Sequence, residues 1–242
     1  MKKKILTSIV AGLFLSTCVF AVPTLQVYIA GATAGNFGAD EDTWLTGNSS
    51  FDLILVGAYG PHTQSLQSAT LVASVPQGQT GSITVNGAPV LTTGTDADIL
   101  TNVAGNDGYA TKSFQPDNFD NHYPFQSDVS DFVLFDAGSF SNSDPVHNYD
   151  ADSGTISPNS GTGQEKTFAV SISGFDYVHF DVYALETDLL GRSKLVSTWQ
   201  INPGSHDAAF NSPPSVVPAP GALLLSSIGA GLVGWLRSRR AL

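Results

Sequence analysis

The central part of the chain alternates short apolar runs with turn-forming residues, and this pattern constrains the fold more than any other feature. In the run 25–29, Leu25, Val27 and Ile29 occupy alternate positions and therefore share one face of an extended strand. Clusters of Gly, Pro, Asn and Asp separate the runs, and no central segment has the spacing of an amphipathic helix. The pattern predicts an all-β fold, namely a jelly-roll-like β-sandwich of about eight strands.

The segments expected to form strands are 25–29, 51–55, 71–75, 82–85, 132–135, 168–173, 178–185 and 195–201. After the fourth of them, Asn86-Gly87 is the strongest two-residue hairpin signal in the chain. In the segment 178–185, His179 and Asp181 share a face with Tyr183. We interpret this face as the solvated outer surface of the sandwich. The alternative, a metal site at His179 and Asp181, needs further ligands that the spacing does not place.

The charge is distributed unevenly along the 242 residues. Six of the ten basic residues lie near the two ends, so the centre has four basic against 21 acidic residues and a formal charge of −17. Such a region repels phosphate backbones and anionic membrane surfaces, which excludes nucleic acid as a partner. The single cysteine, Cys18, lies near the N-terminus, within residues 1–21. The centre therefore has no thiol for disulfide or metal-thiolate chemistry.

The first 21 residues have the three parts of a secretory signal peptide. Lys2 to Lys4 supply a positive start, Ile5 to Phe20 form an apolar stretch, and the run ends in the small residue Ala21. We expect signal peptidase to cleave after Ala21 and the rest of the chain to be exported. The exported domain then covers residues 22–210 and is followed by a Pro/Ser linker at 211–216.

The last residues, 217–242, begin with Val217, Pro218, Ala219 and Pro220 and continue into an apolar segment at 221–236. A helix over this segment spans roughly 24 Å, which is short for a hydrocarbon core of about 30 Å. The basic residues Arg237, Arg239 and Arg240 follow it. Because arginines after a span remain in the cytoplasm, the acidic domain is predicted to lie outside the cell.

This tail resembles the PEP-CTERM sorting signal, in which a Pro-x-Pro box, a short apolar helix and an arginine cluster end the protein. The resemblance implies processing by exosortase, a membrane enzyme, near 218–220. The chain departs from the family signature at Ala219, where the family has Glu, and this leaves the efficiency of cleavage open. A plain C-terminal membrane anchor is the alternative interpretation.

The central region resembles a second group of bacterial surface proteins, labelled choice-of-anchor N. The matching segments are 25–33, 41–44, 50–53, 76–87, 128–132 and 205–208. This group has interchangeable anchors and no assigned activity. The resemblance therefore implies a surface protein and supplies no site.

The stretch 106–128 is too long for a hairpin turn, and loops of this length are usually functional or loosely ordered. It interleaves acidic residues with aromatic ones, among them Tyr109, Phe119 and Tyr123. These rings are candidates for stacking on the apolar faces of sugars, with extracellular polysaccharide as the ligand. The alternative is that they cover the open end of the sandwich.

Two groups of acidic residues are candidates for calcium binding. Asp150 and Asp152 open a segment with oxygen-bearing residues at alternate positions, although a glycine falls one residue late for an EF-hand and Asn159 stands in the place of the bidentate Glu. Asp117 and Asp120 form the second group. Ordinary turn chemistry explains the same residues without a cation, and no other cofactor is expected.

Two sequence motifs imitate catalytic or nucleotide-binding sites. In Ser205-His206-Asp207, adjacent side chains of an extended segment point to opposite sides, so we expect no triad and assign Asp207 to capping nearby amides. The segment 161–167 imitates a phosphate loop, but Glu165 occupies the required glycine position, and we expect a solvated hairpin turn there.

The sequence thus predicts a non-enzymatic, secreted protein of the cell surface or extracellular matrix that is transiently anchored in the membrane and sorted by exosortase. An extracellular carbohydrate-binding module, stabilised by calcium or not, is the alternative. A secreted hydrolase requires paired carboxylates in one cleft, which scattered acids cannot show.

Overall fold

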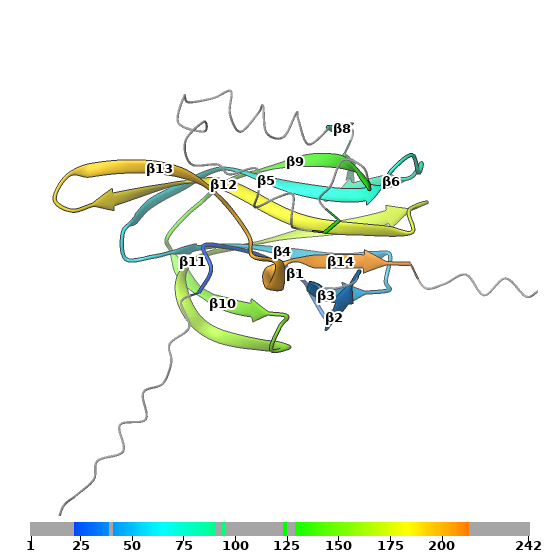
Figure 1. Cartoon of the computed structure of the whole chain (residues 1–242), viewed down its shortest axis with the longest axis horizontal. Helices are drawn as coiled ribbons and strands as arrows, with labels where there is room; N and C mark the ends of the chain where they lie inside the picture. The colour runs from blue at the N-terminus through cyan, green and yellow to red at the C-terminus, as the bar shows by residue number, and fades with distance from the viewer. Residues whose placement is uncertain (1–21, 39–40, 91–92, 95–122, 125–128, 213–242) are drawn as a thin grey trace, which may run out of the picture.

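The computed structural model describes residues 22–38, 41–90, 93–94, 123–124 and 129–212, and in these residues the protein is an all-β fold of two sheets (Figure 1). The first sheet consists of β1 (Leu25–Ile29), β4 (Ser50–Tyr59), β6 (Ser82–Val85), β7 (Ala88–Pro89), β10 (Asp144–Asp150) and β11 (Thr155–Ser173). The second consists of β2 (Thr33–Phe37), β3 (Glu41–Thr46), β5 (Thr63–Pro76), β8 (Thr93–Gly94), β9 (Ser130–Phe140), β12 (Tyr177–Leu190), β13 (Lys194–Ile201) and β14 (Ala208–Asn211). A single 3-10 turn in the described residues, η1 (Gly204–His206), precedes β14.

The strand order shows how distant segments meet. The first sheet runs β1-β4-β11-β6-β7, with β10 paired to β11, and the second runs β2-β3-β14-β12-β5-β9-β8, with β13 paired to β12. All described pairings are antiparallel except that of β14 with β3, which is parallel. The strand β12 is therefore central, because β5 pairs along one edge while β14 and β13 pair along the other.

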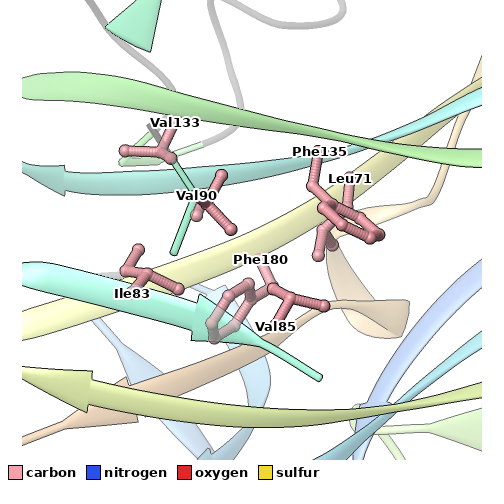
Figure 2. A pocket seen from close by; sticks show the side chains of 8 residues that line it. Leu71, Ile83, Val85, Val90, Val133, Phe135 and Phe180 are labelled. Carbon is pink, nitrogen blue, oxygen red and sulfur yellow. The ribbon is translucent and has the colours of Figure 1, made fainter. Parts of the chain in front are cut away.

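The main core lies between the facing sides of the two sheets. Leu53 and Leu55 of the first sheet and Phe180 and Val182 of the second belong to one buried apolar cluster. A small cavity of about 10 Å³ remains at this core, lined by apolar side chains of both sheets (Figure 2). A space of this size with no polar partner does not hold an ordered water, so it is a packing gap and not a ligand site.

The long β10–β11 hairpin adds a further layer against β1. All five residues of β1 are buried, including Gln26, which is 0% exposed. The Gln26 side chain accepts a hydrogen bond from the Tyr149 backbone N–H at 2.8 Å and donates one to the His147 carbonyl at 3.2 Å. The Tyr28 and Tyr149 rings stack beside it at 4.3 Å. One amide side chain thus provides hydrogen-bond partners for a backbone N–H and a backbone carbonyl of β10, as a paired strand would.

All eight expected strand segments lie within observed strands, and 25–29 and 82–85 coincide with β1 and β6. The predicted Asn86-Gly87 turn is confirmed, because φ is 51° at Asn86 and 78° at Gly87 and Val85 pairs with Ala88. The estimate of about eight strands was too low. The six additional strands are β2, β3, β7, β8, β10 and β14; most of them are short or rich in polar and small residues, so they carry little alternation.

The segment 161–167 is not a hairpin turn, which corrects the sequence interpretation. It lies inside β11 and pairs with β4, and its first residues also pair with β10. A Cβ atom on Gly163 would collide with the carbonyl oxygen of Gly57 on β4. Gly163 of this motif therefore allows a close strand contact that a residue with a side chain would prevent.

The predicted signal peptide 1–21, most of the linker 211–216 and the tail 217–242 lie outside the described residues. Within the part of the chain that is described, no helix combines the length and the apolar character needed to cross a membrane.

Candidate functional site: a buried ion triad

One histidine lies between two carboxylates at the beginning of β12. His179 Nδ1 is 3.1 Å from Asp181 Oδ2 on the same strand, and His179 Nε2 is 3.2 Å from Asp207 Oδ2, which stands just before β14. All three residues are 0% exposed. We call His179, Asp181 and Asp207 the ion triad.

The strand register explains why these residues meet. Side chains two positions apart on a strand share a face, which places His179 beside Asp181. The strand β14 pairs with β12, with His179 opposite Ala209 and Phe180 opposite Ala208, and this pairing brings the preceding Asp207 to the imidazole. The contact between His179 and Asp207, which are 28 residues apart in the chain, therefore depends on the pairing of β12 with β14 and not on local spacing.

The face that carries the triad was predicted to be solvated, and this prediction is wrong. His179 and Asp181 do point away from Phe180 and Val182 of the main core, as alternation requires. However, Phe37 of β2 packs on the imidazole, with ring centroids 5.2 Å apart. Farther along the same face, a second apolar cluster contains Val72, Phe132, Tyr183 and Trp199.

Asn202 links the triad to the backbone of β12. Its Nδ2 donates to Asp181 Oδ1 at 3.1 Å, and its Oδ1 accepts from the Val182 N–H at 2.7 Å. The Asn202 N–H also donates to the Val182 carbonyl. These bonds fix the carboxylate of Asp181 and the chain that leads from β13 into η1.

The electrostatics favour a charged imidazole. Burial by itself lowers the pKa of His179, but the carboxylates of Asp207 and Asp181 raise it, and the result is a pKa of about 9. The ring is therefore an imidazolium at neutral pH. Because a buried charge is stable only when it is paired, the two carboxylates explain how this cation is retained in the interior.

Metal binding is the other chemistry that these residue types allow. One histidine nitrogen and one oxygen of each carboxylate all lie within 4.8 Å of one another, and within the described ranges this is the one such group of three. A metal ligand must be a neutral imidazole with a lone pair facing the ion. Here the two ring nitrogens face different carboxylates, an arrangement that fits an ion-pair bridge better than convergent ligation of one cation.

A serine stands beside the triad without the geometry of a nucleophile. Ser74 of β5 is opposite His179 in the register and is fully buried. General-base activation of a hydroxyl requires a ring nitrogen aimed at it. Both nitrogens of His179 face carboxylates instead.

The residues of Ser205-His206-Asp207 have separate partners. His206 Nδ1 lies 2.8 Å from Ser205 Oγ, and its Nε2 lies 3.0 Å from Asn148 Oδ1. Asp207 faces His179 instead. Capping of nearby amides, the role expected for Asp207, does not account for its carboxylate, which has a long-range ionic partner that no local motif signals.

The carboxylate of Asp150 is engaged by its own turn. It accepts hydrogen bonds from the backbone N–H groups of Asp152 and Ser153 and from the Ser153 hydroxyl. These are the bonds of an Asx-type turn between β10 and β11. The second calcium candidate, Asp117 with Asp120, lies outside the described residues, and calcium binding stays a prediction.

Of the three candidate glycan-contacting rings, Tyr123 is described, whereas Tyr109 and Phe119 lie outside the described residues. The Tyr123 ring lies 6.0 Å from that of Phe37, which also contacts Tyr177 and His179. Tyr123 is 36% exposed. This ring therefore belongs to an aromatic group at the border of the ion triad. The processing residues Ala21, Val217 to Pro220, Arg237, Arg239 and Arg240 lie outside the described part of the chain.

Fold and site together define a two-sheet, all-β protein with a buried ion triad on one sheet. Neither family models nor curated proteins nor solved structures yield a match to this chain.

Proposed function

We propose that this is a non-enzymatic protein of the bacterial cell surface or extracellular matrix, exported by its first 21 residues and sorted by exosortase at its tail. The observation that carries the proposal is the order of parts at the C-terminus: Val217 to Pro220, the apolar segment 221–236 and then Arg237, Arg239 and Arg240. In this step the protein is the substrate, while signal peptidase and exosortase are its partners.

The composition supports an extracellular location. The centre has a formal charge of −17, which favours solubility, and it contains no cysteine, so its folding does not depend on a redox environment. The two-sheet fold is consistent with the proposed sandwich. A jelly-roll topology is part of the proposal, and the parallel pairing of β3 with β14 is a departure from the antiparallel order of that fold.

The intact mass of the protein recovered from the cell exterior tests this proposal. With a functional exosortase we expect loss of residues 1–21 and of the segment after the Pro-x-Pro box. Without the enzyme, the C-terminus should be complete and membrane-bound. A complete C-terminus in both cases would refute sorting and favour a plain anchor.

Two variants separate recognition from anchoring. Replacing Pro218 and Pro220 by alanine should block trimming and leave the apolar segment able to enter the membrane. A matched control replaces Pro213 and Pro214 of the linker, where we expect trimming to continue. Equal trimming of both variants would show that the Pro-x-Pro box is not read.

A carbohydrate-binding module is the second candidate, and the exposure of Tyr123 is the observation that favours it. A partly exposed ring that packs near a second aromatic is suited to stacking on a sugar face. We expect saturable binding on a glycan array to be lost in Tyr123→Ala and retained in Tyr123→Phe. Binding that is unchanged in Tyr123→Ala, Tyr109→Ala and Phe119→Ala would remove this candidate.

A further inference from the structure

The turn that joins β12 to β13 combines exposed leucines with positive charge. Leu190 and Leu195 are 44% and 64% exposed. Between them, Arg192 and Lys194 are exposed as well, and they are two of the three basic residues in the described part of the chain. The third, Lys166, donates to the Ala137 carbonyl at 2.6 Å and is partly buried. We call residues 190–195 the cationic tip.

The cationic tip lies at the opposite end of the sheet from the exit of the C-terminal segment. Tyr177 at the start of β12 pairs with Asn211 at the end of β14. Leu190 is 13 residues farther along β12, a length of about 40 Å in an extended strand. Figure 1 shows the β12–β13 turn at one end of the molecule and the exit from β14 at the other.

The turn between β10 and β11 has the complementary character. Asp150 and Asp152 supply negative charge there, and Ile156 is 43% exposed. The large apolar side chains that are exposed in the described residues are Tyr123, Ile156, Leu190 and Leu195, so three of these four lie on the two turns. We call residues 150–156 the acidic turn.

The two turns cannot meet within one molecule. The Ala151 N–H donates to the Ser205 carbonyl, which places the acidic turn beside η1. Asn202, just before η1, pairs with Val182 on β12. Leu190 is eight residues beyond Val182, about 25 Å along an extended strand. Any contact between the two turns therefore joins different copies of the chain.

We propose that the cationic tip of one molecule binds the acidic turn of a second copy. The opposite charges attract, and Leu190, Leu195 and Ile156 supply apolar area that each molecule leaves exposed. Because the contact joins two different surfaces, each bound pair still has one tip and one turn free. Such a heterologous contact forms open chains or closed rings. This inference does not depend on how the protein reaches its location.

Sedimentation of the full chain in mild detergent at several ionic strengths tests the contact. Association through the predicted C-terminal helix is common to every variant, so differences between variants report on the two turns. We expect concentration-dependent oligomers that weaken as salt rises, because both charged surfaces are solvent-exposed. A single species that does not change with concentration or salt would overturn the proposal.

Charge reversal makes the test specific. Arg192→Glu with Lys194→Glu, and separately Asp152→Lys, should each weaken association about tenfold or more, since like charges would then face each other. Asp152 suits this purpose because no side-chain bond to it is among the described contacts of its turn. Asp52→Lys, at an exposed position of β4, is the matched control and should leave the tip contact unchanged.

Mixing the two reversed variants is the decisive arm. In the mixture, the unchanged tip of the Asp152→Lys variant can bind the unchanged turn of the tip variant, and the acidic tip can bind the basic turn. Association should therefore recover above the level that either variant reaches alone. Failure of the mixture to associate would overturn the assignment of these two turns as partners. Binding of the wild-type tip to anionic vesicles, without self-association, would overturn it in favour of a lipid surface.

Discussion

The two ends of β12 differ in which side chains are buried: charged residues are buried at one end, and leucines are exposed at the other. Near its beginning, His179 and Asp181 are fully buried, whereas near its end Leu190 is 44% exposed and the adjacent Leu195 of β13 is 64% exposed. Fully buried charged residues are rare, whereas single exposed leucines are common on protein surfaces. The difference lies in their partners. The buried charges have oppositely charged neighbours within the molecule, and the exposed leucines lie beside exposed basic residues on a turn.

This comparison separates residues that affect the stability of the fold from residues that are available for binding. A buried charge is destabilising when it loses its partner, so removing one member of the ion triad should destabilise the fold. An exposed leucine has little effect on the stability of a monomer, so the cationic tip is free to serve an interaction. The following changes test whether this division is correct, from the largest expected effect to the smallest.

Replacing His179 by Gln should have the largest effect. The change removes the cation and leaves Asp181 and Asp207 buried without their charged partner, which costs about 3–5 kcal/mol in the free energy of unfolding. Urea denaturation of the wild type and the variant measures this loss. The exposed Asp152→Asn is a suitable control and should remain within about 0.5 kcal/mol of the wild type. A loss of that small size in His179→Gln would show that the triad is not a structural ion pair.

Raising the pH should remove the contribution of the triad without a mutation. The folded pKa of His179 is about 9, above the usual 6.5, so its stabilisation is complete below pH 6.5 and is lost as the pH rises through 9. The shift corresponds to about 3 kcal/mol. Melting temperatures between pH 6 and pH 10 should fall more steeply for the wild type than for His179→Gln. Parallel curves would contradict a charged imidazole.

Removing the side chain of Asn202 should have an intermediate effect. Asn202→Ala deletes the bonds to Asp181 and to the Val182 N–H, and two buried polar groups lose a partner. We expect a loss of about 1–3 kcal/mol. Asn202→Asp should be worse than Ala, because it adds a third carboxylate to the triad. The opposite ranking in denaturation curves would mean that the amide does not support Asp181.

Truncating an exposed leucine should have the smallest effect on stability. Leu195→Ala is expected to change the free energy of unfolding by less than about 0.5 kcal/mol. Its matched control is Leu66→Ala, at a position that is 0% exposed in β5, where we expect a loss of about 2–5 kcal/mol. Similar losses for both would show that Leu195 is part of the core.

Many of the strands and turns can be predicted from the local sequence pattern, whereas the ion triad cannot. Strong alternation predicted the strands that contain Leu53 and Phe180, and a turn dipeptide predicted the β6–β7 hairpin. The same alternation correctly placed His179 on the face opposite Phe180. It could not show whether that face is exposed, because the answer depends on Phe37 and Asp207 from other strands. The acidic residue that completes the triad had no local signal, since its own neighbours suggested a different motif.

By itself, the sequence determined the all-β fold class. The period of its apolar residues specifies strands, and its glycines, prolines and asparagines specify where the strands turn. It also determined the acidic character of the centre, because charge is a property of composition. Only the tertiary structure decided which charges are buried and which leucines are exposed. Both depend on strand pairing between segments far apart in the chain, and pairing selects neighbours by register and packing, which no local pattern records.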